Sequence, residues 1–343
     1  MQTASATPAD YTYNRKVKTR TTARRPANPP RAKKPRIGHA AAAADGAKQW
    51  VQRRSAAIVI LQSEPLARQK WASHGFSTRE GGASRLENSI ARSKQTELVL
   101  NLGFSDWDQR ARVDENRRRF QKALGAESMK LVALRQIHSD IIHAIDAVPA
   151  HALRGDALIT AAPGLMIAVQ TADCIAILLA DPEHRVVAAV HAGWRGTLKR
   201  IAEKTVGRMR MLFGSRPEKI LAALGPGIGR CCYEVGPEVA KEFASQFENA
   251  REWFDGPFDA LASGADPNPL PWLTMMPPGH QPDPPRVQLD LRAANRAILE
   301  GAGVAAKNIS ASDLCTACRT DLLFSHRREK PTGRLMAAIA VLR

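Results

Sequence analysis

The stretch from residue 165 to residue 196, LMIAVQTADCIAILLADPEHRVVAAVHAGWRG, contains three apolar runs separated by short polar turns. Each run (165–169, 175–179 and 186–190) is short and rich in branched side chains, which predicts a buried strand. The following residues, 197–213, carry apolar side chains at helical spacing and end before Gly214, which predicts a helix. Strands and helices do not alternate strictly along the chain, so we expect an α/β fold with mixed sheets.

Three residues in and near this stretch are good ligands for a divalent metal ion: His138, Cys174 and His191. Each stands where a predicted strand ends or where two strands meet, and a sheet would hold it rigidly at the edge of a cleft. Two imidazoles and one thiolate fill three corners of a zinc tetrahedron and leave the fourth for water or substrate. Their spacing matches no zinc finger, so the fold must bring them together. We predict a metal enzyme, with Zn²⁺ as the ion.

Two carboxylates and two arginines are further candidates for catalysis. Zinc lowers the pKa of a bound water to about 7, and the resulting nucleophile can attack a ring carbon that bears an amino group. Such a reaction needs a proton carrier, and Asp173 and Asp140 lie nearest in sequence, although either carboxylate could instead orient a ligand imidazole. Arg79 in FSTREGG and Arg195 in GWRG could bind phosphate or ribose oxygens. We assign the catalytic roles to Asp173 and Arg79.

Other chemistries use the same residues. Cys174 could be a nucleophile with His191 as its base, as in a thiol hydrolase, but His138 would then have no clear role. A copper enzyme that oxidises phenols would need several clusters of histidines, and the chain has no His-x-His pair. Both alternatives remain open on the residues alone.

The net charge of +17 is concentrated at the N-terminus. Residues 1–54 contain 13 Arg and Lys and only 2 Asp, which accounts for +11 of the total. Residues 1–55 lack hydrophobic periodicity, so we expect a disordered basic tail, which also resembles an organelle transit peptide. Without interleaved aromatic residues, the tail is expected to be solvated. A nucleic-acid-associated protein that acts through this tail is the non-enzymatic alternative.

The remainder, 56–343, is expected to form one catalytic domain. Nine prolines between 251 and 285 predict a surface insertion without regular structure. SHRREKPTGR (325–334) carries three arginines that could surround an anion, but a solvated basic loop is the simpler expectation. No apolar run reaches the length of a membrane span.

The five cysteines are an odd number in a long chain, which does not indicate a disulfide framework. We therefore expect a reducing, cytoplasmic setting. Cys231-Cys232 and Cys315-x-x-Cys318 could form a second zinc site, but CxxC normally pairs with another CxxC, so we expect ordinary packing.

Several ordered motifs resemble the YfiH-type family. They include HGFSTREGG (74–82), QIHSD (136–140), GDALIT (155–160), TADC (171–174), VHAGWRG (190–196), LGPGIGRCCYEVG (224–236) and LFSHRR (323–328). The resemblance covers about residues 70–343 apart from the proline-rich insertion. Members of this family are described both as laccase-like polyphenol oxidases and as purine nucleoside phosphorylases with adenosine deaminase activity.

The resemblance implies a single-domain α/β fold with layered mixed sheets flanked by helices, of the type also seen in cytotoxic necrotizing factor deamidases. It implies zinc held by His138, Cys174 and His191, or copper in a polyphenol oxidase, with Arg79 near the site. The implied substrates are adenosine, inosine, guanosine or 5'-methylthioadenosine, with phosphate as cosubstrate. His326 departs from the family pattern, in which tyrosine is more frequent at this position.

Overall fold

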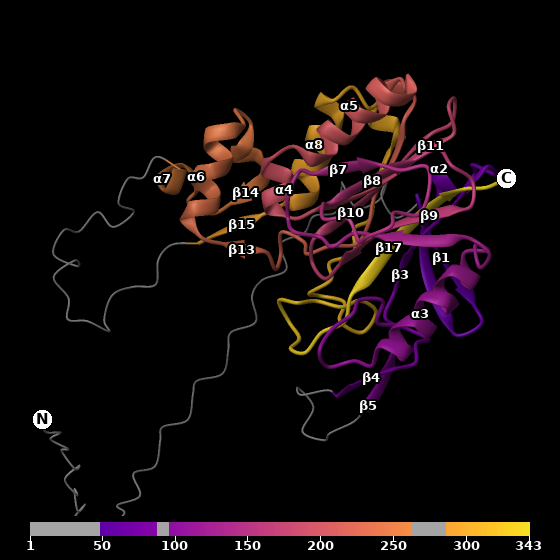
Figure 1. Ribbon diagram of the computed structural model, residues 1–343. Helices are drawn as coiled ribbons and strands as arrows, with labels where there is room; N and C mark the ends of the chain where they lie inside the picture. The colour runs from indigo at the N-terminus through magenta and orange to yellow at the C-terminus, as the bar shows by residue number, and fades with distance from the viewer. Residues whose placement is uncertain (1–48, 88–95, 263–285) are drawn as a thin grey trace, which may run out of the picture. The chain divides into compact units, whose positions relative to one another are not determined.

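The computed structural model describes residues 49–87, 96–262 and 286–343 (Figure 1). All of these described residues belong to one unit. The folded part begins earlier than the boundary expected at residue 56, because Trp50–Ser55 forms strand β1 and pairs with β2. Arg53 and Arg54 are both exposed on this edge strand, so the strand lacks the alternation of apolar and polar residues that marks a half-buried one.

Two six-stranded sheets form the core. The first has the order β1-β2-β3-β17-β9-β6, and the second has the order β16-β12-β10-β11-β8-β7. Most neighbours are antiparallel, but β6–β9, β12–β16 and β7–β8 are parallel. Beyond β1, the first sheet consists of β2 (Ile58–Ser63), β3 (Ala72–Ser77), β17 (Leu335–Val341), β9 (Leu165–Thr171) and β6 (Lys130–Ala133). The second consists of β16 (Ile309–Ala311), β12 (Leu221–Leu224), β10 (Ile175–Asp181), β11 (Val186–Ala192), β8 (Ala157–Thr160) and β7 (Ile142–Ala144).

The two large sheets pack face to face, with β9 and β17 of the first against β10 and β11 of the second. Because side chains alternate along a strand, each strand contributes to two layers. In β9, Ile167 and Val169 belong to the core between the sheets, together with Leu178 and Val187 of the second sheet. Complete burial of such a side chain contributes about 1.5–3 kcal/mol, so this core supplies much of the stability that holds the site.

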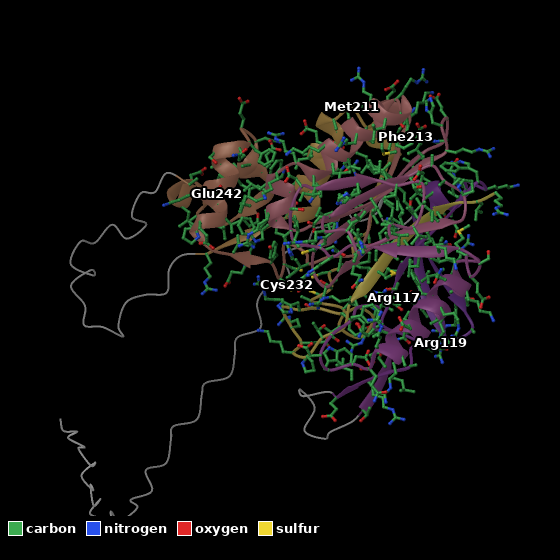
Figure 2. All side chains as sticks on the ribbon, viewed as in Figure 1. Arg117, Arg119, Met211, Phe213, Cys232 and Glu242 are labelled. Carbon is green, nitrogen blue, oxygen red and sulfur yellow. The ribbon has the colours of Figure 1, made fainter. Side chains whose placement is uncertain are left out.

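Helices cover the outer face of each sheet. Met166 of β9 points away from the inter-sheet core and packs with Phe120 of α3 (Arg110–Ala123). On the second sheet, Ile177 packs with Met209 of α5 (Ile201–Phe213) and Ile298 of α8 (Leu291–Gly301). The opposite face of α5 carries Met211, which is exposed (Figure 2).

The remaining elements are short. The helices are α2 (Glu64–Ala67), α4 (Trp194–Leu198), α6 (Pro237–Gln246) and α7 (Phe258–Ala262), with 3-10 turns η1 (Pro217–Lys219), η2 (Ala250–Trp253) and η4 (Ala306–Asn308). Two small sheets pair β4 (Ser84–Glu87) with β5 (Thr96–Val99), and β13 (Glu234–Val235), β15 (Val287–Leu289) and β14 (Phe254–Asp255).

The helix expected over 197–213 is divided into α4 and α5 by Arg200, whose φ of 58° is left-handed. No glycine or proline marks this break. Tertiary contacts hold it, because the Arg200 guanidinium lies 4.2 Å from the centroid of the Phe247 ring and donates to the Gln246 carbonyl oxygen. Gly214 caps α5 in the left-handed conformation, as the sequence predicts.

The first part of the expected 251–285 insertion is regular. It contains η2, β14 and α7, because Trp253, Phe254 and Phe258 are buried in the aromatic cluster around Phe243. Residues 263–285 lie outside the described residues. None of the helices in the described ranges combines the length and apolarity needed to cross a membrane. The predicted α/β fold with layered mixed sheets and flanking helices is confirmed.

Candidate metal centre and its pocket

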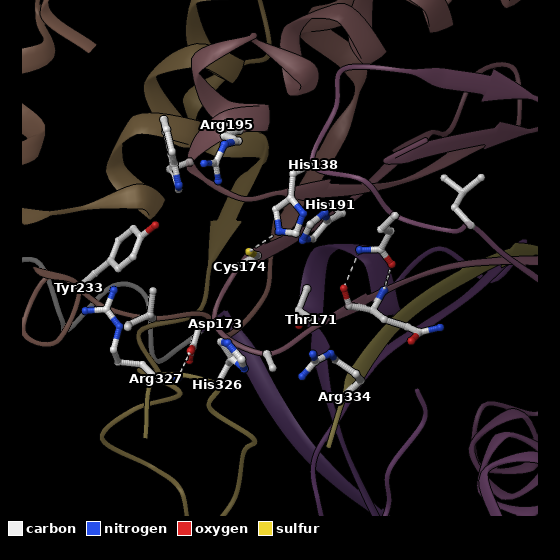
Figure 3. A pocket seen from close by; sticks show the side chains of 16 residues that line it. His138, Thr171, Asp173, Cys174, His191, Arg195, Tyr233, His326, Arg327 and Arg334 are labelled. Carbon is white, nitrogen blue, oxygen red and sulfur yellow. Dashed lines mark hydrogen bonds between the residues drawn. The ribbon is translucent and has the colours of Figure 1, made fainter. Parts of the chain in front are cut away.

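The structure brings the three predicted ligands together (Figure 3). Their donor atoms all lie within 4.8 Å of one another, and the Cys174 Sγ is 4.0 Å from the His138 Nε2. His138 lies in the loop after β6, Cys174 immediately precedes β10, and His191 is in β11. In the antiparallel register of β10 and β11, Ala176 lies opposite His191. Cys174, two residues before Ala176, is therefore close to His191.

Backbone geometry and one buried carboxylate shape the loops around these ligands. Asp156, at the start of β8, accepts hydrogen bonds from the backbone N–H groups of His138 (3.1 Å) and Ser139 (2.6 Å), which fold the loop around it. His138 itself has a left-handed φ of 57°. Gly193 approaches the ligands closely, since a Cβ there would lie 2.9 Å from the Cys174 Sγ. A larger residue at this position would therefore displace the sulfur.

Asp156 also orients a ligand. Its Oδ1 lies 2.8 Å from the Nδ1 of His191, and both side chains are buried. If Nδ1 carries the proton and donates it to the carboxylate, Nε2 is left as the nitrogen available to Cys174 and to an ion. A carboxylate–histidine pair of this kind is the usual support of a metal-binding imidazole. In the sequence Asp156 stands out only as part of the GDALIT motif (155–160), which does not predict this role.

The ionisation of the cluster follows from these contacts. Burial raises the pKa of the Cys174 thiol, but the charge of His191 and hydrogen bonds from His138 and His191 outweigh burial and lower it to about 6. Burial lowers the pKa of His191, but the Cys174 thiolate and the bond to Asp156 outweigh it and raise the pKa to about 9. The cluster therefore stabilises a thiolate, which is the form of cysteine that binds metals, and a divalent ion would displace the proton that the His191 Nε2 otherwise holds.

The donor set fits a divalent metal ion. Three candidate donor atoms, two nitrogens and one sulfur, converge at a pocket, and an ion held by them would have a fourth position open, as in catalytic zinc sites. A His₂Cys set also suits copper. Among the described residues, only one other group gathers three or more His, Cys, Asp or Glu donors, and it contains no histidine. Histidine clusters for several copper ions are therefore absent from the described part of the chain.

The pocket at these ligands has a volume of about 530 Å³. Its wall includes Trp194 and Tyr233 and three arginines, Arg195, Arg327 and Arg334 (Figure 3). None of the three arginines forms an ion pair with a carboxylate of a described residue. The guanidinium groups of Arg327 and Arg334 donate to the backbone carbonyl oxygens of Glu234 and Gly333, respectively. The wall thus carries three arginines against one carboxylate, Asp173, which suits the pocket to an anion.

A family model described as multi-copper polyphenol oxidoreductase laccase matches residues 73–342. The chain belongs to this family, the YfiH type. The family resemblance expected from the motifs is therefore confirmed.

Relatives of this YfiH-type protein carry names of purine nucleoside enzymes. A purine nucleoside phosphorylase of Deinococcus radiodurans is 38% identical over 272 residues, which cover 79% of this chain and 89% of that protein. A protein named adenosine deaminase RL5, from an unknown prokaryotic organism, is 36% identical over 67% of this chain and 81% of that protein. The crystal structure of YlmD from Geobacillus stearothermophilus has a TM-score of 0.66 and 30% identity, over 85% of this chain and 99% of that chain.

The two predicted catalytic residues of this YfiH-type protein have different surroundings. Asp173 lines the pocket, but its Oδ1 accepts from the Thr316 hydroxyl (2.6 Å) and its Oδ2 from the Arg327 backbone N–H (2.7 Å). Both contacts fix the loop that carries Arg327, so the geometry shows an anchoring role, and proton transfer by Asp173 stays a prediction. Asp140 pairs with Lys204 and is not among the residues that line this pocket.

Arg79 does not reach the pocket, and its predicted catalytic role finds no support in the structure. Its side chain is 3% exposed and forms ion pairs with Glu329 (2.8 Å) and Glu97 (3.1 Å). It also donates to the Thr320 carbonyl oxygen. These partners occupy the guanidinium and leave little of it for phosphate. Two of the arginines that line the pocket, Arg327 and Arg334, come from the segment 325–334, for which a solvated loop was the simpler expectation.

His326, the position that departs from the family pattern, also lines the pocket. It is adjacent to Arg327. The histidine at this position therefore changes the wall of the pocket and not a distant surface.

Proposed function

We propose that this protein is a zinc-dependent purine nucleoside phosphorylase, acting on adenosine, inosine, guanosine and 5'-methylthioadenosine, with adenosine deaminase activity. One arrangement carries the proposal: an open three-ligand cluster shares a pocket with three arginines that have no carboxylate partner among the described residues. The names of the relatives, purine nucleoside phosphorylase and adenosine deaminase, support purine nucleosides as the class of substrate. The free thiols of the chain are consistent with work in the cytoplasm, which is part of the proposal.

The residues of the pocket have different proposed roles. His138, Cys174 and His191 would hold the ion, while Asp156 keeps the His191 ring in place. A bound zinc ion supplies Lewis acidity and makes a water molecule acidic enough to react at neutral pH.

The arginines are assigned to the phosphate cosubstrate. A guanidinium binds phosphate oxygens through two parallel hydrogen bonds, and a bound phosphate is thereby held near the ribose carbon that it attacks. Burial raises the pKa of the Tyr233 phenol, so its hydroxyl remains a donor at neutral pH. With Trp194 it offers aromatic surface to a purine ring.

A copper-dependent polyphenol oxidase is the second candidate, and the description of the family favours it. A single His₂Cys cluster suits one copper ion but not the several ions that a laccase uses. A thiol hydrolase based on Cys174 and His191, oriented by Asp156, is the third. Under that reading the position of His138, 4.0 Å from the sulfur, has no function.

Metal analysis combined with a chromatographic assay on adenosine tests the proposal. Zinc in the purified protein is expected, with inosine formed regardless of phosphate and adenine formed only when phosphate is present. Chelation should abolish both products, and readdition of zinc should restore them. Copper with oxygen consumption on phenols would contradict the proposal, as would activity that survives chelation but is lost when Cys174 is alkylated.

A further inference from the structure

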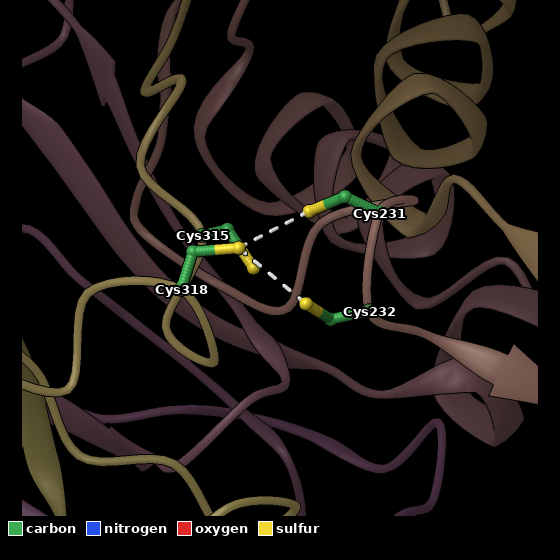
Figure 4. A group of neighbouring side chains, drawn as sticks. All are labelled: Cys231, Cys232, Cys315 and Cys318. Carbon is green, nitrogen blue, oxygen red and sulfur yellow. Dashed lines mark hydrogen bonds between the residues drawn. The ribbon is translucent and has the colours of Figure 1, made fainter. Parts of the chain in front are cut away.

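A second cluster of possible metal ligands lies outside the triad His138, Cys174 and His191. The four cysteines Cys231, Cys232, Cys315 and Cys318 have their Sγ atoms within 4.8 Å of one another (Figure 4). Cys318 lies at the centre, 3.5 Å from the Cys231 sulfur and 3.4 Å from the Cys232 sulfur. Ordinary packing was expected for these residues, and the tertiary structure instead joins two loops more than eighty residues apart.

The sheet explains why the two loops meet. Strands β12 and β16 are parallel neighbours, so the segments that follow them leave the same edge together. A β-bridge joins Gly227 to Cys315, and the Thr316 N–H donates to the Gly227 carbonyl oxygen. At Gly229, a Cβ would stand 3.2 Å from the Cys315 Cβ and 3.3 Å from the Cys231 Sγ. Glycine therefore allows the first loop to close over the thiols of the second.

We propose that these four cysteines bind a structural zinc ion. Four thiolates at about 2.3 Å from a tetrahedral zinc ion lie about 3.8 Å apart, close to the separations around Cys318. Four protein ligands leave no position for substrate, which distinguishes a structural ion from a catalytic one.

Hydrogen bonds offset the negative charge that four thiolates would gather. The Gly229 N–H donates to the Cys315 Sγ at 3.1 Å, and the Arg328 guanidinium donates to the Cys232 Sγ at 3.6 Å. Donors of this kind, outside the ligands themselves, support metal-bound sulfur.

A disulfide accounts for the cluster less well. It would join two of the four sulfurs and leave the other two thiols without a function, although all four converge. All four thiols are free in the structure, and Cys231 and Cys318 are exposed. Cys318 is nearly equidistant from two partners, which suits a shared ion better than a single S–S bond.

The ion would connect two parts of the pocket wall. Ile228 and Tyr233 come from the first loop, and His326 and Arg327 follow shortly after the second cysteine pair. Arg328, the residue after Arg327, links the two regions because its guanidinium donates to the Cys232 Sγ. Zinc in this cluster would therefore hold in place the part of the pocket wall that carries Tyr233 and Arg327, without taking part in the reaction.

Counting zinc in variants tests the proposal independently of the enzymatic activity. Full-length protein purified without a metal-affinity tag should contain about two zinc ions per chain by mass spectrometry of the elements. Cys318→Ser and Cys231→Ser should each reduce this to about one, and Cys174→Ala should remove the other ion while leaving the cysteine cluster loaded. A failure of the proposed nucleoside activity would leave these counts unchanged.

Cobalt spectroscopy covers the case in which the serine variants do not fold. Folded Cys174→Ala protein reconstituted with Co²⁺ should show the thiolate-to-cobalt charge-transfer band and the intense visible bands of a tetrahedral all-sulfur site. A zinc content of one per chain that Cys318→Ser leaves unchanged would overturn the proposal. So would a disulfide from Cys318 to Cys231 or Cys232, found by alkylating and sequencing the freshly isolated protein, or iron in place of zinc.

Discussion

Two segments of the chain carry the same pair of side chains in different settings. HGFSTREGG (74–82) and HAGWRG (191–196) each begin with a histidine in a buried strand and place an arginine shortly after it. His74 accepts a hydrogen bond from the Ser63 backbone N–H, whereas His191 faces the carboxylate of Asp156. Arg79 is enclosed by two glutamates, whereas Arg195 is exposed at the pocket without an acidic partner among the described residues.

The partners determine what each pair can do. Burial and the charge of Arg53 lower the pKa of His74 to about 4, so this ring is neutral and structural. The thiolate of Cys174 and the carboxylate of Asp156 overcome burial at His191 and raise its pKa to about 9. For the arginines, Arg79 has its interactions complete and stabilises the fold, whereas Arg195 keeps unused hydrogen-bonding capacity at the pocket and is available to a ligand.

Replacing His191 should have the largest effect. His191→Ala removes one of three pocket ligands, so the pocket ion should be lost and kcat/KM for both reactions should fall by about 10³-fold or more, equivalent to about 4 kcal/mol. Metal analysis and the chromatographic assay measure this. His74→Gln is the matched control, and its folded fraction should keep the ion and the activity. Equal losses in both variants would show that the two histidines do not differ in function.

Substitutions of Arg79 and Arg195 should have different effects, one on the free energy of unfolding and the other on the binding of phosphate. Arg79→Met leaves Glu329 buried without its partner, so the free energy of unfolding should fall by about 3 kcal/mol while the KM for phosphate stays constant. Arg195→Met should change stability by less than about 1 kcal/mol, because the side chain is exposed and loses chiefly its stacking on Trp194. Its KM for phosphate should rise about tenfold. Denaturant unfolding and initial-rate kinetics give these quantities, and a raised phosphate KM in stable Arg79→Met protein would restore the catalytic role first predicted for Arg79.

The neutral state of His74 predicts a pH dependence of stability. Its pKa of about 4 in the folded protein is below the ordinary value of 6.5, so the folded state favours the uncharged ring. This contribution is complete above pH 6.5 and is lost as the pH falls toward 4, by an amount on the order of 3 kcal/mol. Unfolding free energies measured across this range should fall more steeply for the natural protein than for His74→Gln. Parallel curves for the two proteins would contradict the assignment.

Asp156 should have a smaller effect, because it acts through His191. Asp156→Asn weakens the hold on the imidazole, and metal affinity or activity should fall by about 10-fold to 100-fold. Asp140→Asn is the control, since Asp140 pairs with Lys204 at the surface. Competition with a chelator measures the affinity. An Asp156→Asn protein with the metal affinity of the Asp140→Asn control would show that the carboxylate is not needed to orient the ring.

The sequence predicted the convergence of three side chains, where local pattern and chemistry coincide. Apolar runs predicted β9, β10 and β11, and the donor types of His138, Cys174 and His191 predicted that these side chains meet. It did not predict Asp156 as a partner of His191, because an aspartate before a buried strand resembles any other polar strand end. It also did not predict that Arg79 pairs with Glu97 and Glu329, because an arginine near two glycines looks the same whether it faces a ligand or glutamates.

The sequence by itself determined the class of fold and the types of side chain available, because hydrophobic periodicity and ligand chemistry are local properties. Only the tertiary structure decided which of these side chains have partners. Asp156 reaches His191 across 35 positions, Glu329 reaches Arg79 across 250, and Cys318 reaches Cys231 across 87. Such contacts depend on sheet register and on parallel strands that end at one edge, and no window of sequence contains both partners.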